Sequence, residues 1–562
     1  MFADIGAPED GPFVPDPFQR EALKTVAQAD CLVTAPTGAG KTWIARQAMA
    51  RVIKSGGRCW YASPLKALSN AKYLEFSEFF GFQQVGILTG DRRENSGASL
   101  IVGTTEILRN QLYDAMSDGQ TLAADLVVLD EAHYLGDPQR GVVWEEIIIY
   151  LPARITLLLL SATIGNASQL AGWLSSVRNR SCQWVRATVR PVPLEPLVLH
   201  PGGTLLPLEA PKPARGRKSK LHPKVRQLGS AAKPWSLKGS WGRPPFGHIL
   251  DGLRKMKLSP AIFFLKSRKD CDMALKICAR ELAGALDPNP RRTQRVTELL
   301  DDHPFLKYHR HRRFLEHYGI GAHHSGHLPA WKLILETLMG EGLLNAIFAT
   351  STVAAGINVP ARAVVFFNTD RFNGHEFAPL TATEFHQMTG RAGRRGMDRV
   401  GFVVGIPGRF MDLSAYGRLV RSPAGEIVSQ IQVSFSMVLN LLLSHPPAQV
   451  EDLLARSFAA YQLKGETPQN VSPRPSPLSG TQALTDSFRR HVRFLRAHGY
   501  LDSEGHPTAD GVWAARLRVD QPLLIAEAFR QGAMPEEDPA LLAAVVAAFV
   551  SEREYEQDDE LD

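Results

Sequence analysis

Three short segments of this 562-residue chain hold residue types that handle phosphate, and the first of them is APTGAGKT at residues 35–42. It follows the apolar run CLVT and precedes a helical stretch. Small residues let backbone N–H groups converge on a phosphate at the start of a helix. Lys41 is predicted to reach the β- and γ-phosphates of ATP, and the Thr42 hydroxyl to coordinate Mg²⁺. The loop of the predicted ATP site is made by Thr37, Gly38, Ala39, Gly40, Lys41 and Thr42.

The second segment is DLVVLDEAH, an aliphatic run that ends in the adjacent carboxylates Asp130 and Glu131. A buried strand that delivers two carboxylates to its carboxyl end supplies the other half of a nucleotide-hydrolysing site. Asp130 is expected to hold Mg²⁺ together with Thr42. Glu131 is expected to lie beside the metal and to orient and deprotonate the attacking water.

The third segment is FHQMTGRAGRRGMD, residues 385–398, in which three arginines stand among glycines. The γ-phosphate gains charge during transfer and needs cations around it, whereas the first half of the chain offers only Lys41. Arg391 and Arg394 are predicted to complete the site from a second domain. Hydrolysis would then depend on closure of a cleft between domains, and closure on ATP. The alternative interpretation is a solvated surface turn.

The elements that must position these segments are predicted from the apolar runs of the chain. From about residue 18 to 190, and again from 246 to about 411, short apolar runs alternate with amphipathic stretches. Near-continuous apolar strands separated by helices indicate parallel sheets covered on both faces. We therefore predict an α/β protein with two doubly wound domains. The runs expected to form strands are CLVTAP, RCWYASP, VGILTG, SLIVGTT, DLVVLDEAH, ITLLLLSAT, AIFFLKS, NAIFATS, AVVFFN and VGFVVG.

The predicted boundaries divide the chain into six parts. A Pro- and Gly-rich basic stretch separates the two α/β domains, and a Pro/Ser linker lies between two helical regions that follow them. The parts are residues 1–190, the first α/β domain with the ATP-binding loop; 191–245, the basic linker; 246–411, the second α/β domain; 412–464, a small helical module; 465–483, the Pro/Ser linker; and 484–562, a helical segment with an acidic tail.

Composition narrows the class of protein. The chain has 44% hydrophobic and 22% charged residues, which is typical of a globular protein. No run reaches the roughly 18 to 20 apolar residues that a membrane span needs. The first residues show no signal-peptide pattern, and the five cysteines contain no C-x-x-C pair. We expect a cytoplasmic protein with free thiols and no membrane partner.

The net charge of +7 hints at nucleic acid, but it is concentrated in one segment. Residues 212–243 hold ten Lys or Arg and no Asp or Glu, so subtracting these ten charges from +7 leaves −3 for the rest of the chain. The segment is interpreted as a solvated tether, with a flexible arm that contacts nucleic-acid phosphates as the alternative.

Seven of the 17 histidines fall between residues 303 and 327. Ordinary surface and core positions are the favoured interpretation, since imidazoles serve in both. A metal site is the alternative, because His323 and His327 are four residues apart.

Taken in order, the motifs resemble those of superfamily-two helicases, and most closely the superkiller-like RNA helicases with bacterial relatives. The wording KALSNAKY, RGVVWEE, HHSGHLP and GRAGRRGMD is specific to that branch. The resemblance implies two RecA-like domains, a winged-helix module at 412–464 and a partial, ratchet-like helical domain at 484–562. The segments that carry it are DPFQREA (16–22), APTGAGKT, SPLKALSNAKYLEF (63–76), GTTEILRNQLYD (103–114), LDEAHYLGDPQRGVVWEE (129–146), LSATIGNA (160–167), AHHSGHLPAWK (322–332), FATSTVAAGINVPAR (348–362) and FHQMTGRAGRRGMD.

This resemblance also implies roles for residues around the nucleotide, with ATP and Mg²⁺ as cofactors. Gln19 would recognise adenine, and Phe13 would pack on the base. Gly356 and Asn358 would lie near the nucleotide, and Gln387 would join the two arginines at the γ-phosphate.

A second set of implied roles concerns the nucleic-acid strand. Ser161 and Thr163 would link hydrolysis to the nucleic-acid cleft. Contacts to phosphates by hydroxyls, amides and occasional cations carry no sequence preference. The residues expected to contact the strand are Pro64, Lys66, Thr105, His324, Ser325 and Thr352.

The resemblance implies an ATP-dependent helicase or translocase that moves 3′ to 5′, most consistent with RNA. We expect a monomer that binds single-stranded RNA or DNA or a tailed duplex and works with a ribonuclease or other RNA-processing partner. One alternative is a DNA helicase of the fork-repair branch, but those relatives tend to have proline where this chain has Arg395. The other alternative is an ATP-switched clamp that does not unwind, because the helical segment at the end is short. The Pro/Ser linker stands where eukaryotic members of the family carry a long arch, so partner docking through an arch is not expected.

Overall fold

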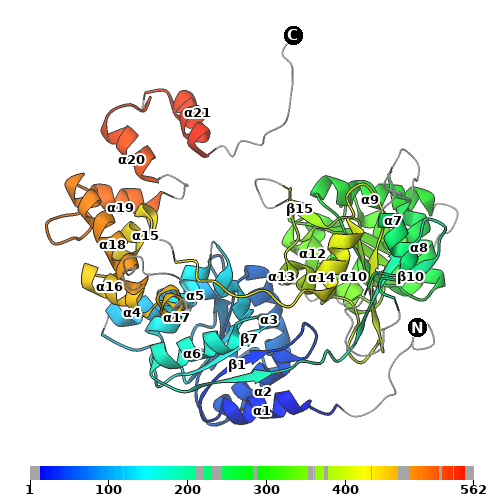
Figure 1. Cartoon of the computed structure of the whole chain (residues 1–562), viewed down its shortest axis with the longest axis horizontal. Coiled ribbons are helices and arrows are strands. Elements are labelled where there is room, and N and C mark those ends of the chain that lie inside the picture. Colours follow the sequence, from blue (N-terminus) through cyan, green and yellow to red (C-terminus); the bar gives the residue numbers. More distant parts are fainter. Residues whose placement is uncertain are drawn as a thin grey trace, which may run out of the picture.

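In the computed structural model, the helices and strands form two α/β domains and a helical body (Figure 1). In that view the first domain lies at the bottom, the second on the right and the helical body on the left. The described residues are 13–117, 119–138, 140–210, 220–229, 243–282, 288–351, 359, 361–372, 377–431, 433–465, 480–517, 522–535 and 537–550.

The first domain is built on an eight-stranded sheet in which every strand except β4 runs parallel to its neighbours. All six strands predicted for this half are present. The strands are, in spatial order, β4 (Arg93–Glu94), β3 (Val85–Leu88), β5 (Leu100–Thr104), β2 (Cys59–Ser63), β6 (Leu126–Asp130), β7 (Thr156–Ser161), β1 (Asp30–Thr34) and β8 (Cys182–Arg186).

Helices cover both faces of this sheet. Successive strand residues point to opposite faces, so Val33 packs with one set of helices and Leu32 with the other. The first set is α1 (Pro17–Thr25), α2 (Lys41–Lys54) and α3 (Lys66–Phe80), and the second is α4 (Thr105–Ser117), α5 (Gly141–Tyr150) and α6 (Ala167–Arg178).

The second domain has a seven-stranded sheet that is parallel except for its edge strand β10. The four strands predicted here are present, β12 was not predicted, and two more strands, β9 and β10, come from the range assigned to the basic linker. The linker prediction missed them because Pro196 and Pro207 interrupt their aliphatic runs. The strands are β10 (Leu205–Pro207), β9 (Leu194–Leu199), β17 (Gly401–Gly405), β14 (Ala363–Phe366), β11 (Ala261–Phe264), β13 (Ala346–Ala349) and β12 (Ile320–His323).

Helices again lie on both faces of the second sheet. Val225 and Leu228 of α7 are buried against it, so part of the basic segment 212–243 folds onto the domain. The rest of that segment lies outside the described residues, except for Lys220–His222 and Arg243. The helices are α7 (Pro223–Gly229), α8 (Phe246–Lys255), α9 (Arg268–Glu281), α10 (Pro290–Asp301), α11 (Arg312–Tyr318), α12 (Pro329–Gly340), α13 (Ala382–Thr389) and α14 (Leu413–Arg421). A separate hairpin pairs β15 (Asp370–Phe372) with β16 (Phe377–Pro379).

The helical body joins segments from both sides of the predicted Pro/Ser linker. Val438, Leu454, Phe488 and Ala514 come from four of its helices and share one hydrophobic core, which continues into α5 and α6 of the first domain. The sequence separates these helices into two modules, whereas the structure packs them as one body. The helices are α15 (Phe435–Leu442), α16 (Pro447–Arg456), α17 (Phe458–Gly465), α18 (Gly480–Ala497), α19 (Ala509–Arg516), α20 (Pro522–Arg530) and α21 (Pro539–Val550).

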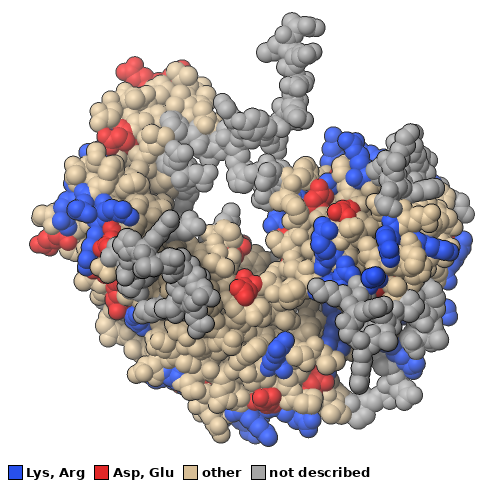
Figure 2. Space-filling model, viewed as in Figure 1, with Lys and Arg blue, Asp and Glu red and all other residues tan. Residues whose placement is uncertain are grey.

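Among the described helices, none is long and apolar enough to cross a membrane. On the face drawn in Figure 2, the surface is hollowed between the helical body and the second domain, above the first. The nucleic-acid strand of the predicted function needs an open channel of this kind.

Candidate active site

The predicted phosphate loop connects the end of β1 to the start of α2, as the sequence indicated. Gly38 and Gly40 have φ of 81° and 85°, which residues with a side chain rarely adopt. The Lys41 ammonium donates to the Ala35 carbonyl at 3.0 Å and to the Pro36 carbonyl at 3.4 Å. Burial lowers the pKa of Lys41, and the charges of Glu131 and Asp130 oppose that change. The amine therefore lies over its own loop, facing the carboxylates.

Asp130 is the last residue of β6, and only β7 lies between β6 and β1. Because these three strands are parallel, Asp130 and the phosphate loop lie at the same edge of the sheet. Burial, together with the charge of Glu131, raises the pKa of Asp130 to about 6. The Tyr61 hydroxyl donates a hydrogen bond to Asp130 Oδ2. Sequence reasoning missed Tyr61, although its place at the centre of the neighbouring strand β2 was a signal.

The backbone of Glu131 is strained. Its φ of 60° lies in the left-handed region that few residues other than glycine adopt, and such strain concentrates at functional sites. Burial favours the neutral acid, but the nearby His133 and Lys41 together hold the pKa of Glu131 below its ordinary value. Glu131 is therefore ionised at neutral pH and can accept a proton.

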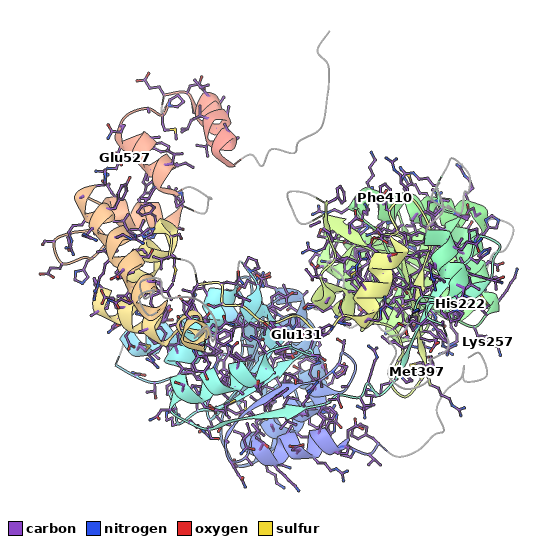
Figure 3. All side chains as sticks on the ribbon, in the orientation of Figure 1. Glu131, His222, Lys257, Met397, Phe410 and Glu527 are labelled. Carbon is purple, nitrogen blue, oxygen red and sulfur yellow. The ribbon has the colours of Figure 1, made fainter. Side chains whose placement is uncertain are left out.

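A chain of contacts leads from Glu131 across to the second domain. Glu131 Oε2 lies 3.3 Å from His133 Nδ1, and His133 Nε2 lies 2.7 Å from the Gln387 side-chain nitrogen on α13. Figure 3 shows Glu131 where the first domain meets the second. The structure thus brings together two predicted site residues that are 256 positions apart in the chain.

Arg391 also faces the first domain. Burial lowers its pKa, and the charge of Glu131 opposes that change. Arg190, in the segment after β8, donates to the Gly390 carbonyl at 2.9 Å and to the Ala392 carbonyl, so it fixes the backbone on both sides of Arg391. Arg190 is a second residue that sequence reasoning missed, and its signal was an arginine directly before the paired prolines of RPVP.

Arg394 does not face the loop in this structure. Its guanidinium makes two hydrogen bonds to Asp398, of 2.8 Å and 3.0 Å, and only 9% of its side chain is exposed. Asp398 also accepts from Arg362 at 2.7 Å. The sequence predicts Arg394 at the γ-phosphate. In this structure its guanidinium binds Asp398 instead, because that carboxylate is only four residues away.

Arg395 crosses the cleft instead. It donates to the Ala39 carbonyl at 2.8 Å and to Asp16 at 2.7 Å. Its guanidinium lies 5.6 Å from the centre of the Phe13 ring. The sequence placed Arg395 beside the two predicted site arginines without assigning it a contact.

The residues expected at the adenine end are close together. Gln19 is fully buried, accepts from the Asp16 N–H at 2.8 Å and donates to the Gly40 carbonyl at 3.0 Å. Phe13 is 58% exposed beside Trp43, at a ring distance of 5.5 Å. An exposed ring beside a buried amide is suited to hold a flat base, although base recognition by Gln19 stays a prediction.

Lys72 on α3 is a further polar residue of the site. Its ammonium donates to Thr42 Oγ1 at 3.1 Å and pairs with Glu75 at 2.8 Å. Its charge also lowers the pKa of Asp130, against the effect of burial. The segment KALSNAKY contributed to the family resemblance, and only its Lys66 was assigned a contact, so the role of Lys72 beside the phosphate loop was missed.

A cavity of about 240 Å³ lies beside the loop and between the two domains. Its lining includes Thr37, Thr163, Arg190 and Gln387. Ser161, at the end of β7, has a buried hydroxyl with no hydrogen-bond partner in the described part of the chain. The roles of Ser161 and Thr163 in linking hydrolysis to the nucleic-acid cleft remain predictions.

The predicted strand contacts divide into two groups. Lys66 and Ser325 are exposed, and Lys66 lies 3.4 Å from Asp91. The side chains of Pro64, Thr105 and His324 are buried, so they do not face an incoming strand in this conformation. Thr352, Gly356 and Asn358 lie outside the described residues.

Two family models of known proteins match parts of the chain. Residues 16–170 match the DEAD/DEAH box helicase family model, and residues 504–561 match the DSHCT (NUC185) domain model. The chain therefore contains a DEAD/DEAH box helicase domain and resembles the superkiller-like branch of the superfamily-two helicases.

Relatives from bacteria and mammals align with most of the chain. It is 38% identical over 476 residues to probable helicase HelY of Mycobacterium tuberculosis, covering 80% of this chain and 52% of HelY. It is 37% identical over 468 residues to human exosome RNA helicase MTR4, covering 81% and 44%, and 35% identical over 472 residues to human superkiller complex protein 2, covering 80% and 37%. The chain therefore spans about half the length of HelY, or less of the two human proteins.

The residues present fit ATP and Mg²⁺, which this helicase family uses. Backbone amides at the start of α2 and the Lys41 ammonium suit a triphosphate, whereas the Thr42 hydroxyl and the Asp130 carboxylate are oxygen ligands of the kind Mg²⁺ prefers. Bound Mg²⁺ would supply charge neutralisation at the phosphates. Glu131 would take the proton of the attacking water.

Proposed function

We propose that this protein is an ATP-dependent nucleic-acid helicase that acts on RNA and hydrolyses ATP at the cleft between its two α/β domains. The contact chain from Glu131 through His133 to Gln387 carries this proposal. It ties the carboxylate that would activate water to the helix that precedes Arg391. Closure of the cleft and assembly of the hydrolytic site would then be one event.

The division of labour within the site follows from the contacts. Lys41 and the start of α2 bind the phosphates, Asp130 and Thr42 hold Mg²⁺, and Glu131 accepts the proton. Arg391 stabilises the charge that develops on the γ-phosphate, and Arg190 keeps the Arg391 backbone in place.

RNA as substrate and movement from 3′ to 5′ are proposed from the resemblance to RNA helicases of this branch. Two of the relatives are named as an exosome RNA helicase and a superkiller complex protein, which supports an RNA-processing partner such as a ribonuclease. DNA is the competing substrate, because the expected contacts are to phosphates, which both polymers share.

The first experiment measures steady-state ATP turnover without polymer, with single-stranded RNA, and with single-stranded DNA of matched length and sequence. We expect RNA to stimulate turnover more than DNA does. Stimulation by DNA alone would contradict the proposed substrate, and equal turnover in all three conditions would contradict coupling between the two sites.

The second experiment separates a helicase from a clamp by displacement of a labelled strand from a duplex with a 3′ single-stranded tail. We expect displacement with ATP and Mg²⁺ and none with a duplex that carries a 5′ tail. A protein that hydrolyses ATP with RNA yet displaces neither duplex would be an ATP-switched clamp.

A further inference from the structure

Four titratable side chains of the second domain gather away from the nucleotide cleft. Asp272 belongs to α9, His311 directly precedes α11, and His324 and His327 lie in the loop between β12 and α12. Asp272 Oδ1 lies 3.1 Å from His324 Nε2, 3.7 Å from His311 Nε2 and 3.7 Å from His327 Nε2. Three ring nitrogens thus surround one carboxylate oxygen.

Three ring nitrogens of this cluster have no hydrogen-bond partner in the described part of the chain. Both ring nitrogens of His311 and Nε2 of His327 are buried and unpartnered, and His311 is only 1% exposed. A buried imidazole nitrogen that is neither hydrated nor hydrogen-bonded destabilises the folded protein, and a bound ion would relieve that cost. Burial lowers the pKa of His311 to about 4 and that of His327 to about 3, so both rings are neutral at pH 7.

We propose that Asp272, His324 and His327 bind one Zn²⁺ ion, with the buried His311 beside them. The candidate ligand atoms of Asp272, His324 and His327 all lie within 4.8 Å of one another. Tetrahedral zinc, with bonds of about 2.0–2.1 Å, places neighbouring ligand atoms roughly 3.3 Å apart. The distances from Asp272 Oδ1 to His324 Nε2 and His327 Nε2, 3.1 Å and 3.7 Å, bracket that value. Two imidazoles and one carboxylate suit zinc rather than Mg²⁺, which prefers oxygen ligands.

The surroundings support the carboxylate as a ligand. Arg310 donates to Asp272 Oδ2 at 2.7 Å, which fixes the carboxylate and leaves Oδ1 directed at the rings. His323, the other histidine considered from the four-residue spacing, instead contacts Glu336 at 3.0 Å and lies outside the cluster. Of the two histidines considered from the spacing, the proposed site would use His327 and not His323.

One contact must change when the ion binds. The Gly326 N–H donates to His324 Nδ1 at 3.2 Å, so His324 carries its ring proton on Nε2 without metal. Zinc on Nε2 moves that proton to Nδ1, and the Gly326 contact has to open. The exposed Ser325 lies between these residues, so binding would reshape the loop that presents Ser325.

The test uses the full chain after treatment with a chelator. Zn²⁺ is titrated against a chromophoric chelator, and Co²⁺ is added separately to record the visible absorption of a tetrahedral site. We expect about one Zn²⁺ per chain, a tetrahedral Co²⁺ spectrum, and a higher unfolding temperature with Zn²⁺. His327→Leu and Asp272→Asn should each weaken Zn²⁺ binding by more than about tenfold.

His317→Ala is the matched control, because His317 is an exposed histidine from the same stretch. It should bind Zn²⁺ as the unaltered chain does. The proposal is overturned if the unaltered chain binds no Zn²⁺, or if His327→Leu and Asp272→Asn bind it as tightly as His317→Ala. Binding does not rest on the proposed helicase activity, so the metal titration decides this site even if that activity fails.

Discussion

At the scale of single residues, the adjacent carboxylates of the site have opposite protonation behaviour. The pKa of Asp130 is raised to about 6 by burial and by Glu131, whereas the pKa of Glu131 is lowered by His133 and Lys41. A pair of carboxyl groups whose pKa values are pushed apart assigns the two groups to different tasks. The more readily ionised Glu131 is suited to accept a proton, and Asp130 to be ionised fully when a cation arrives.

The raised pKa of Asp130 makes its metal site sensitive to pH. The native protein keeps this proton between about pH 4 and 6, where the unfolded chain has lost it, so this group lowers the free energy of unfolding as pH rises through that window. Mg²⁺ must displace the same proton. We expect the affinity of the ATP-bound protein for Mg²⁺ to fall about tenfold per pH unit below pH 6 and to be nearly constant above about pH 7, as measured by titration of a fluorescent nucleotide.

Tyr61→Phe is a matched variant for this measurement. The Tyr61 hydroxyl stabilises the ionised Asp130, so its removal should move the onset of the loss to higher pH. An Mg²⁺ affinity that is flat from about pH 5 to 8 in both proteins would contradict the assignment of Asp130.

A second prediction concerns the pair between Arg394 and Asp398. Removing one member leaves the other charge poorly compensated in a buried position, at a cost of about 3 kcal/mol. We expect Arg394→Ala to lower the free energy of unfolding by about this amount in denaturant titration, although Arg362 still contacts Asp398. Arg399→Ala, at an exposed position of the same segment, should leave stability nearly unchanged. Equal stability of both variants would show that the pair contributes nothing to folding.

At the scale of elements, strands were predicted wherever the aliphatic run was continuous. DLVVLDEAH and ITLLLLSAT became the central strands β6 and β7, because a strand buried on both faces needs apolar residues at every position. β8 and β9 were missed because their runs contain polar residues or proline. α18 was assigned to a separate module because a Pro/Ser linker precedes it in the sequence, although it packs against α16 and α17 in the structure.

Site residues could likewise be predicted where the neighbouring sequence fixes their position, and could not where a contact with a distant residue does. The loop 35–42 and the pair Asp130–Glu131 could be predicted, since the strand before each fixes where they lie. The choice among Arg391, Arg394 and Arg395 could not, because neighbouring residues on one turn point in different directions. The direction of the Arg394 side chain is set by its contact with Asp398. That of Arg395 is set by its contacts with Asp16 and the Ala39 carbonyl.

A prediction at this scale concerns Glu145 of α5, which anchors the helical body. Its carboxylate accepts from the Phe458 N–H at 2.6 Å and from the Ser429 hydroxyl. Burial raises its pKa to about 7, so the native protein keeps this proton between about pH 4.5 and 7 and the free energy of unfolding falls as pH rises through that window. Glu145→Gln still offers an oxygen acceptor but does not titrate, so we expect its unfolding to depend less on pH.

Denaturant titration across roughly pH 5 to 8 checks this expectation. Glu504→Gln, on an exposed carboxylate before α19, should leave the pH dependence unchanged. The same dependence in Glu145→Gln as in the unaltered chain would mean that Glu145 does not carry it.

At the scale of the whole molecule, the two α/β domains are joined differently from the first domain and the helical body. The helical body shares a continuous hydrophobic core with α5 and α6 of the first domain. The second domain meets the first through polar contacts beside a cavity, among them those of Gln387 and Arg395. Interfaces of the first kind hold parts together, whereas polar interfaces beside a cavity permit domain motion. We therefore expect the second domain to move against a rigid unit made of the other two parts (Figure 1).

That motion serves hydrolysis only if the second domain supplies Arg391 to the nucleotide held by the first. The direct measurement is single-turnover ATP hydrolysis by Arg391→Ala, with saturating ATP, Mg²⁺ and single-stranded RNA, beside Arg399→Ala as a surface control. We expect ATP to bind to both variants, with hydrolysis about 10³-fold slower in Arg391→Ala and unchanged in Arg399→Ala. Hydrolysis by Arg391→Ala at the rate of the unaltered chain would contradict a site completed across the cleft.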